Sequence, residues 1–250
     1  MTMYKHAPLS PQNFVFMQEL ALEDVGIEIS GQKEKTDVFY NKIYRRLHDL
    51  NLHDCNTYCD LIKNDSLERE KFINIITNQS TYFFREEEHF RFLKKYLQTL
   101  SGQKRAIGIL SAGCSTGEEP YSIAMVVLEA ISEVETHEIR VIGIDVNTES
   151  LLTAEAGIYA TSGIEAIPKH MQHRFLLKGV RDNVGFVKVH ADVRKLVHFH
   201  YQNLIEEFSL GRKFDVIFWD VWRGRCCYDC TKGSCQAELS CLGNQSLCVI

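Results

Sequence analysis

Acidic side chains follow two short apolar segments of the chain and could bind a nucleoside that carries positive charge. The apolar residues 106–110 lead into a loop that ends in Glu118 and Glu119, and Asp145 follows the apolar residues 139–144. In an open parallel sheet, ligands bind at the carboxyl ends of the strands, where an acid after the second strand typically accepts hydrogen bonds from ribose hydroxyls. The same acids could instead only stabilise helix starts, two in a first turn and one as a cap.

The glycines of the first loop do not match a dinucleotide site. Gly113 and Gly117 permit a tight turn and a close approach of the backbone to a ligand. Their spacing is not the G-x-G-x-x-G of a pyrophosphate loop. Carboxylates at Glu118 and Glu119 would repel a phosphate and suit an ammonium group. These features favour S-adenosylmethionine, a nucleoside with an amino group, a ribose and no phosphate.

The hydrophobic pattern predicts helices first and an α/β domain afterwards. Apolar residues recur at helical spacing through the first hundred positions, and Ser66 is a plausible cap for one of these helices. Strands are predicted at 106–110, 139–144, 185–190, 196–200 and 214–218, and helices at about 118–131 and 148–156. Residues 157–185 are predicted as a loop with a short helix around 168–175. Alternating strands and helices are typical of a doubly wound parallel sheet.

Composition and charge exclude several classes of protein. The chain has 250 residues, 45% hydrophobic and 24% charged, which is ordinary for a globular protein. Its net charge of −5 argues against a globally basic nucleic-acid binder. No apolar run approaches the ~20 residues of a membrane helix, and residues 1–9 show no secretory signal. We therefore expect a cytoplasmic protein without nucleic-acid binding or membrane insertion.

Cysteines are concentrated in two places. Cys55 and Cys59 share a predicted helix face and could begin a metal site, but no second pair lies nearby, which favours buried structural thiols. The other concentration is residues 226–248, where the composition changes abruptly.

Three motifs of this sequence resemble the chemotaxis receptor methyltransferases, the CheR family. They are Thr81-Tyr82-Phe83-Phe84-Arg85-Glu86, Ser115-Thr116-Gly117-Glu118-Glu119-Pro120-Tyr121-Ser122, and Gly143-Ile144-Asp145. Further matches, including Val197-His198-Phe199 leading to Asn203-Leu204, extend the resemblance over about residues 14–218.

The resemblance implies an α/β fold in which a small all-α domain precedes a Rossmann-like methyltransferase domain dependent on S-adenosyl-L-methionine. We place the helical domain at 10–78, a connecting segment and helix at 79–104, the incomplete methyltransferase domain at 105–218, and a divergent Cys-rich tail at 219–250. Family members methylate glutamate side chains on the cytoplasmic helices of chemoreceptors. The expected partner is therefore a chemoreceptor, and a monomer is expected.

The family's functional residues can be carried over where the motifs match. Thr81 and Arg85 are expected to reach the cofactor, and Arg85 is also expected to hold the substrate carboxylate as the catalytic residue; the alternative is a simple surface arginine. The full expected cofactor site comprises Gln79, Thr81, Arg85, Gly113, Glu119 at the amino group, Asp145 at the ribose, and Asn203 and Leu204 beside the adenine. Gln79 stands where many members have asparagine. No metal site is expected.

The implied chemistry needs no general base. A glutamate carboxylate, with a pKa near ~4.3, is already ionised at neutral pH. It attacks the sulfonium methyl in line, so the enzyme has to align the two reactants. Charge is consumed as the methyl moves, and a site that excludes water would favour the reaction.

The resemblance stops after residue 218. The family's Cys-Arg-Asn run and a following tyrosine are absent, and the chain continues Trp219-Asp220-Val221-Trp222. Three interpretations of the tail stay open: a frame change, a disordered extension, or a metal-binding segment built on Cys227, Cys230, Cys235 and Cys241. Without a fifth strand, residues 214–218 would form a hydrophobic edge, which predicts low stability and weak or absent activity.

Two other functions compete with receptor methylation. A non-catalytic module would bind the cofactor or a receptor without transferring a methyl group, because the substrate-side residues are missing. A small-molecule methyltransferase is the third possibility, and the helical domain argues against it. Lys42, Arg45 and Arg46 could form a basic stripe for an acidic receptor helix or an ordinary solvated face.

Overall fold

The computed structural model contains two compact units, which we describe separately. The structure describes residues 9–29, 33–77, 80–100, 106–131, 138–206, 208, 210, 214–219 and 247–249. Among these, residues 9–77 and 203–206 form the helical unit, and the others form the sheet unit. In the described ranges, none of the helices has the length and apolar character needed to span a bilayer.

The helical unit is built from α1 (Pro11–Val25), α2 (Lys33–Asp49), α3 (Cys55–Asn64) and α4 (Ser66–Thr77). Its core includes Met17, Ile43, Leu47, Tyr58, Ile62 and Phe72, none more than 1% exposed. Cys55 and Cys59 are buried in this core, and burial raises the pKa of both thiols, that of Cys59 to about 11. Both side chains contribute to packing of the unit.

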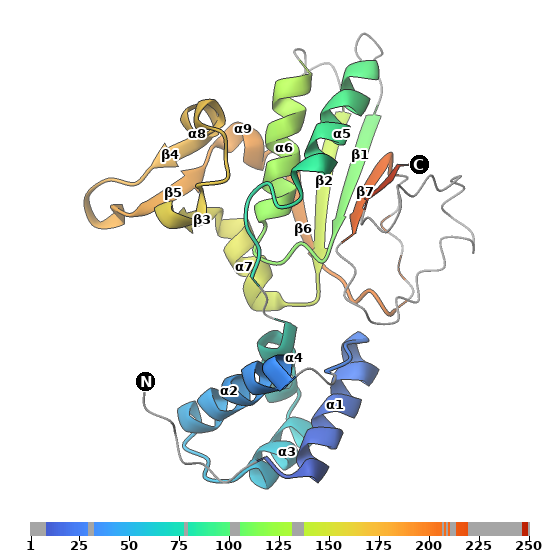
Figure 1. Ribbon diagram of the computed structural model, residues 1–250, viewed down its shortest axis with the longest axis vertical. Helices are drawn as coiled ribbons and strands as arrows, with labels where there is room; N and C mark the ends of the chain where they lie inside the picture. Colours follow the sequence, from blue (N-terminus) through green and yellow to red (C-terminus); the bar gives the residue numbers. More distant parts are fainter. Residues whose placement is uncertain are drawn as a thin grey trace. The chain divides into compact units, whose positions relative to one another are not determined.

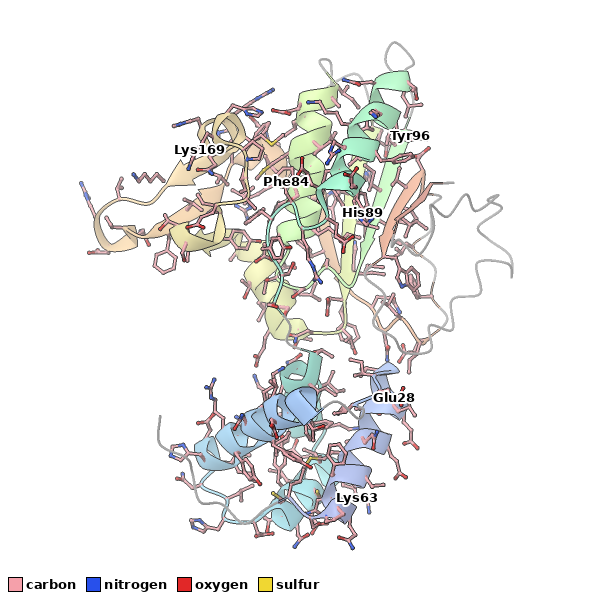
Figure 2. The ribbon with its side chains drawn as sticks, in the orientation of Figure 1. Glu28, Lys63, Phe84, His89, Tyr96 and Lys169 are labelled. Carbon is pink, nitrogen blue, oxygen red and sulfur yellow. The ribbon has the colours of Figure 1, made fainter. Side chains whose placement is uncertain are left out.

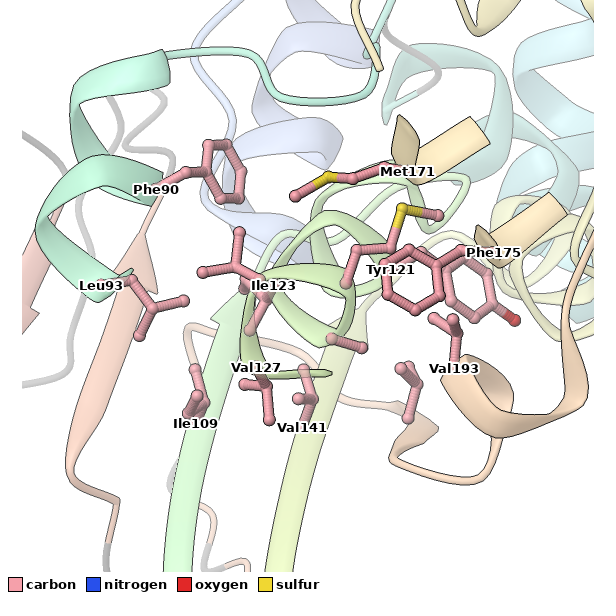
Figure 3. Close-up of a cluster of buried hydrophobic side chains, with 14 of the residues drawn as sticks. Phe90, Leu93, Ile109, Tyr121, Ile123, Val127, Val141, Met171, Phe175 and Val193 are labelled. Carbon is pink, nitrogen blue, oxygen red and sulfur yellow. The ribbon is translucent and has the colours of Figure 1, made fainter. Parts of the chain in front are cut away.

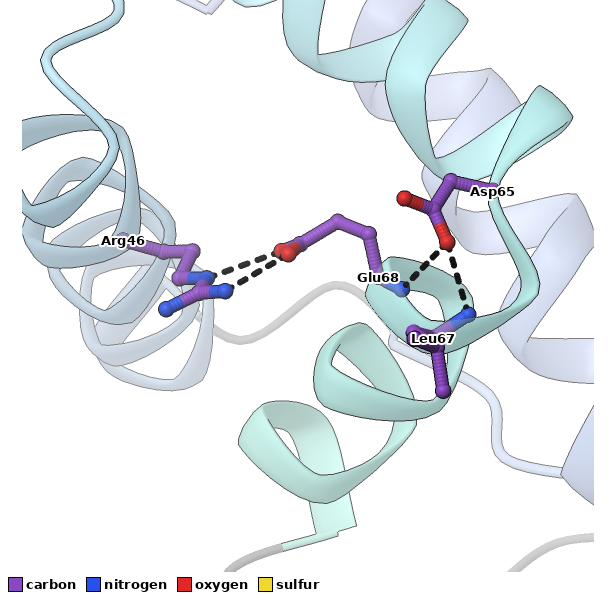
Figure 4. A network of polar contacts seen from close by, with 4 residues as sticks. All are labelled: Arg46, Asp65, Leu67 and Glu68. Carbon is purple, nitrogen blue, oxygen red and sulfur yellow. Dashed lines mark hydrogen bonds and ion pairs between the residues drawn. The ribbon is translucent and has the colours of Figure 1, made fainter.

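The cap of α4 is not the predicted Ser66. The carboxylate of Asp65 accepts hydrogen bonds from the backbone N–H groups of Leu67 at 2.9 Å and Glu68 at 3.4 Å, as Figure 4 shows. Ser66 is the first residue of the helix. The carboxylate of Asp65 therefore caps the helix by accepting hydrogen bonds from its first N–H groups, the role predicted for the serine hydroxyl.

The sheet unit confirms the predicted Rossmann-like class. It begins with α5 (Glu87–Thr99) and continues through β1 (Ala106–Ala112), α6 (Glu118–Ala130), β2 (Glu138–Asp145), α7 (Thr148–Ala156), β6 (Val197–Tyr201), β7 (Val216–Trp219) and β8 (Leu247–Val249). The sheet order is β6-β2-β1-β7-β8, with the first four strands parallel (Figure 1). The order reverses at β1, between β2 and β7, which is where open parallel sheets form ligand crevices.

A second sheet is antiparallel and includes one of the strands predicted for the parallel sheet. The predicted strand at 185–190 forms as β5 (Phe186–Val189), but it pairs with β3 (Ile158–Ala160) and β4 (Leu176–Lys178). The predicted loop therefore holds two strands. The short helix predicted around 168–175 forms as α8 (Lys169–Phe175). The loop also holds the short turns η2 (Thr161–Gly163) and η3 (Arg181–Asn183), while α9 (Ala191–Arg194) follows β5.

The exposed edge predicted for residues 214–218 is not found. β8 pairs with β7 in antiparallel orientation, with Val216 opposite Val249 and Phe218 opposite Leu247. The backbone groups of β7 are therefore paired on both sides, by β1 and by β8. Because β7 is paired on both sides, an exposed hydrophobic edge at this strand no longer predicts low stability.

Helix α6 is the centre of the hydrophobic core and positions the acidic residues at its start. Ile123 and Val127 of α6 lie among Ile109 and Val141 of the sheet (Figure 3). The same cluster contains Phe90 and Leu93 from α5, and Met171 and Phe175 from α8. Because α6 is apolar on nearly every side, its orientation is fixed and so is the direction of its first turn.

Candidate functional site

The loop after β1 folds back onto the end of β2. The N–H groups of Gly113 and Cys114 donate to the carbonyl oxygen of Ile144 at 2.9 and 3.0 Å, and the N–H of Gly117 donates to the carbonyl of Cys114 at 3.0 Å. Gly113, Ser115 and Gly117 adopt positive φ of 80°, 47° and 94°. The loop therefore brings the first turn of α6 next to Asp145.

The two loop glycines have different reasons to be glycine. A Cβ on Gly117 would lie 2.7 Å from the Cβ of Ala154 in α7 and 3.0 Å from the hydroxyl of Tyr159. A Cβ on Gly113 would have nothing within 4 Å. Packing excludes a side chain at Gly117, whereas the exposed Gly113 faces open space that a ligand can approach.

Asp145 is a half-buried carboxyl that two backbone groups hold in place. Its Oδ2 accepts a hydrogen bond from Ser115 N, and its Oδ1 accepts one from Asn147 N, both at 2.8 Å. Burial raises the pKa of Asp145, and the backbone hydrogen bonds oppose that rise. Each carboxylate oxygen can accept more than one hydrogen bond, so the group can also receive two neighbouring hydroxyls.

Hydroxyl groups orient the two glutamates at the start of α6. The Oγ of Ser111 donates to Oε1 of Glu119 at 2.5 Å, and the Oγ1 of Thr116 donates to Oε2 of Glu118 at 2.6 Å. Burial raises the pKa of Glu118. Ser111 and Thr116 were not predicted from the sequence as positioning residues; the available signal for Ser111 was a hydroxyl inside an otherwise apolar strand.

The segment that carries Arg85 is fastened to the same first turn. Phe83 is fully buried and packs edge-on against Tyr159, with ring centroids 4.9 Å apart. The N–H of Phe84 donates to Oγ of Ser122 at 3.0 Å, and that hydroxyl donates to the carbonyl of Glu118 at 2.7 Å. The side chain of Arg85 itself is exposed.

The remaining expected residues are distributed over both units. Thr81 is half-buried in the sheet unit, and Gln79 lies outside the described residues. Asn203 and Leu204 belong to the helical unit. The buried Asn203 donates through Nδ2 to the carbonyl of Asp24 at 2.6 Å, and its Oδ1 accepts from Ile205 N at 3.3 Å. The structure thus gathers Gly113, Glu119 and Asp145 at one end of the sheet.

Cys55, Cys59 and Cys114, in the described part of the chain, are buried and unpaired. Cys114 is 1% exposed, and burial raises the pKa of its thiol well above the ordinary value. The described residues contain no cluster of His, Cys, Asp and Glu that could hold a metal ion. The proposed ligands Cys227, Cys230, Cys235 and Cys241 lie outside the described residues.

The acidic groups of this site fit a cationic nucleoside without phosphate. Three carboxyls (Glu118, Glu119 and Asp145) surround a loop whose exposed glycine leaves room for a ligand. A parallel sheet with this loop after its first strand and an acid after its second is the arrangement with which Rossmann-like folds bind a nucleoside cofactor.

Comparison with known proteins identifies the family. The family described as CheR methyltransferase, SAM binding domain, matches residues 79–221. The chain belongs to the CheR methyltransferase family, and its cofactor is S-adenosyl-L-methionine.

Three relatives show how far the similarity extends. A chemotaxis protein methyltransferase of Klebsiella aerogenes is 34% identical over 219 residues, which cover 86% of this chain and 73% of that protein. Chemotaxis protein methyltransferase 2 of Pseudomonas aeruginosa is 34% identical over 191 residues, 76% of this chain and 68% of that protein. A chemotaxis protein methyltransferase of Escherichia coli is 32% identical over 219 residues, 86% of this chain and 74% of that protein.

Proposed function

We propose that this methyltransferase converts glutamate side chains of chemoreceptors into methyl esters. The observation that carries the proposal is the group of three carboxyls, Glu118, Glu119 and Asp145, held by hydrogen bonds around the loop after β1. The segment that bears Arg85 is fastened to the same first turn of α6. Relatives named chemotaxis protein methyltransferases support the place of the reaction in chemotaxis. We infer that the acceptor lies on the cytoplasmic helices of the receptor.

The residues of the loop would hold the cofactor by its polar groups. The carboxylate of Glu119, oriented by Ser111, would accept hydrogen bonds from the amino group. The carboxylate of Asp145 would accept hydrogen bonds from the ribose hydroxyls. Asn203 and Leu204 would lie beside the adenine, and Gln79 and Thr81 would add contacts from the connecting segment. When bound, the cofactor supplies a methyl group on a positively charged sulfur.

The chain then has to orient the acceptor rather than move a proton. The acceptor glutamate is ionised at neutral pH, so the proposed reaction needs no base. Arg85 would hold one oxygen of that carboxylate with its guanidinium while the other oxygen reaches the methyl group. Alignment of the two reactants supplies the rate enhancement.

The expected basic stripe of the helical unit is largely engaged within that unit. Lys42 donates through Nζ to the carbonyl of Ile75 at 3.0 Å. Arg46 makes two hydrogen bonds to Glu68, at 2.8 and 2.6 Å (Figure 4). Arg45 is exposed. Lys42 and Arg46 are thus held within the helical unit and do not form a free basic stripe with Arg45.

Methyl transfer from labelled S-adenosyl-L-methionine to a purified receptor signalling domain tests the proposal. We expect label that is released as methanol by mild base, because carboxyl methyl esters hydrolyse and N-methyl groups do not. Replacing the acceptor glutamates of the receptor with alanine should remove the label. Light scattering of the purified methyltransferase alone should show a monomer.

A matched pair of arginine variants assigns the role of Arg85. Arg85→Ala should lower kcat/KM about 100-fold or more, the loss of a charge-assisted pair with the substrate. Arg91→Ala is the control, because Arg91 is exposed on the following helix and pairs with Glu88 at 2.8 Å. Cofactor binding without any base-labile label would refute receptor methylation and favour the non-catalytic binding module.

A further inference from the structure

His89 carries a buried nitrogen without a hydrogen-bond partner. It lies in the first turn of α5, as Figure 2 shows. The residue is 5% exposed. Its ring stands edge-on to Phe218 of β7, with centroids 6.2 Å apart. Within the described ranges, Nε2 of His89 and the hydroxyl of Tyr58 are the buried side-chain atoms that lack a partner. Burying such an atom is unfavourable, and a phenylalanine would fill the same place without that cost.

The backbone just before His89 is strained around Arg85. Phe84 and Glu86 adopt positive φ of 56° and 63°, a conformation that side chains with a Cβ disfavour. Such residues persist where the surroundings determine them, and they occur often at functional sites. The N–H of His89 donates to the carbonyl of Glu86 at 2.9 Å, which fixes one side of the turn.

The side chain of Glu86 approaches the unpaired nitrogen. Its Oε2 lies 3.7 Å from Nε2 of His89, and the side chain of Glu86 is half exposed. The two following acids face another partner, because Glu87 and Glu88 approach Arg91 at 3.6 and 2.8 Å. Hydrogen bonds at active sites are often long before ligands bind and tighten in the complex.

We propose that His89 is a positioning residue for methyl transfer. In the substrate complex, the Nε2–H of His89 donates to the carboxylate of Glu86 and holds the left-handed turn that presents Arg85. This inference rests on the proposed function, because the turn that His89 would hold carries Arg85, the side chain proposed to orient the acceptor. A neutral imidazole is sufficient for this role.

The test is a double-mutant cycle on kcat/KM for the receptor domain. His89→Phe keeps the buried ring and removes the nitrogen, and Glu86→Ala removes the acceptor. Each should lower kcat/KM about tenfold, and the double variant should lose no more than either single one, because both break the same contact. His89→Gln keeps an N–H donor and should retain activity within about threefold. Glu87→Ala is the matched control and should change kcat/KM less than about twofold.

Stability separates positioning from packing. His89→Phe should unfold at the same temperature as the parent chain or higher, because an unpaired buried atom is gone. Activity within twofold of the parent in His89→Phe, or losses that multiply in the double variant, would overturn the inference while leaving receptor methylation intact.

A second readout does not depend on activity. Side-chain ¹⁵N spectra recorded with S-adenosylhomocysteine and the receptor domain should show a proton on Nε2 of His89, with a resonance that moves in Glu86→Ala. His89→Phe identifies the resonance by its disappearance. An unprotonated Nε2, or a resonance that Glu86→Ala leaves in place, contradicts the proposed contact even if the parent chain transfers no methyl group.

Discussion

Alanine substitution of the two loop glycines should separate backbone strain from packing. At Gly117, an alanine would keep a φ near 94° and place its Cβ 2.7 Å from the Cβ of Ala154. Left-handed backbone costs a non-glycine residue about 1–2 kcal/mol, and overpacking adds about 1–3 kcal/mol. Gly117→Ala should therefore lower stability by about 2–5 kcal/mol, which is roughly 4–20 °C in Tm for a chain of this size.

Gly113→Ala is the comparison, because its φ is 80° and its Cβ would meet nothing within 4 Å. Only the backbone contribution applies there, about 1–2 kcal/mol or roughly 2–8 °C. The new methyl group would stand in the open space beside the cofactor loop. Gly113→Ala should thus weaken binding of S-adenosyl-L-methionine more than its effect on stability suggests.

Thermal unfolding of the purified variants, followed by circular dichroism, measures both effects, and calorimetric titration measures the affinity. The double variant Gly117→Ala/Ala154→Gly relieves the collision with α7. Its loss of stability should be smaller than the sum of the two single losses. Equal losses for Gly113→Ala and Gly117→Ala, or strict additivity of the double variant, would refute the argument that α7 excludes a side chain at Gly117.

Three further outcomes follow from the site and the core. Asp145→Asn should weaken binding of S-adenosyl-L-methionine about 100-fold in calorimetric titration, because hydrogen bonds to a charged acceptor contribute about 1.5–3 kcal/mol each; a change below threefold would remove Asp145 from the cofactor site. Burial raises the pKa of Asp145 and Glu118, so the folded chain takes up protons at these carboxyls at higher pH than the unfolded chain does. As pH is lowered, the affinity for the cofactor should therefore begin to fall at a higher pH than the one at which ordinary carboxyls take up protons. This fall should be shallower in Asp145→Asn. Arg46→Ala leaves the carboxylate of Glu68, whose side chain is 7% exposed, without its two hydrogen bonds; chemical denaturation should show a loss of about 2–4 kcal/mol, allowing for the partial exposure of Arg46.

Local sequence signals were sufficient for the elements that lie under the site. Helix α7 begins and ends where predicted, at Thr148 and Ala156, and α6 differs from its prediction by one residue at its end. Both helices follow a buried strand, and each begins at a residue type that favours a helix start. Gly117 is the N-cap of α6, and Asn147 is the N-cap of α7. The class of the parallel sheet followed from the same alternation of strands and helices.

Strand pairing between distant segments could not be derived from the sequence. β3 and β4 are three residues long, too short to show an alternation of buried and exposed positions. β5 alternates as a strand should, but its sheet is decided by its neighbours, such as Leu176 opposite Val189. β8 lies beyond residues 79–221, which the family model matches, so the family pattern gave no signal for its pairing with β7.

The chemistry of the site was more accessible to sequence reasoning than its geometry. The residue types of Gly113, Glu119 and Asp145 indicated a cationic nucleoside, and their roles as contacts stay a prediction. The hydroxyl of Ser111 on Glu119 and the left-handed backbone at Phe84 depend on the folded arrangement. Asn203 joins the helical unit through Asp24, across a separation of 179 residues that no local pattern reveals.

The buried thiols give each unit an internal reporter of its own opening. Cys55 and Cys59 lie in the core of the helical unit, and Cys114 lies in the cofactor loop of the sheet unit. A thiol reagent reacts with an accessible thiolate, so burial together with a raised pKa protects all three groups. Modification at these positions can proceed only as fast as the surrounding structure opens. The rates at Cys59 and Cys114, separated by peptide mass mapping, would therefore report the local stability of the two units independently, and bound cofactor should slow the reaction at Cys114 more than that at Cys59.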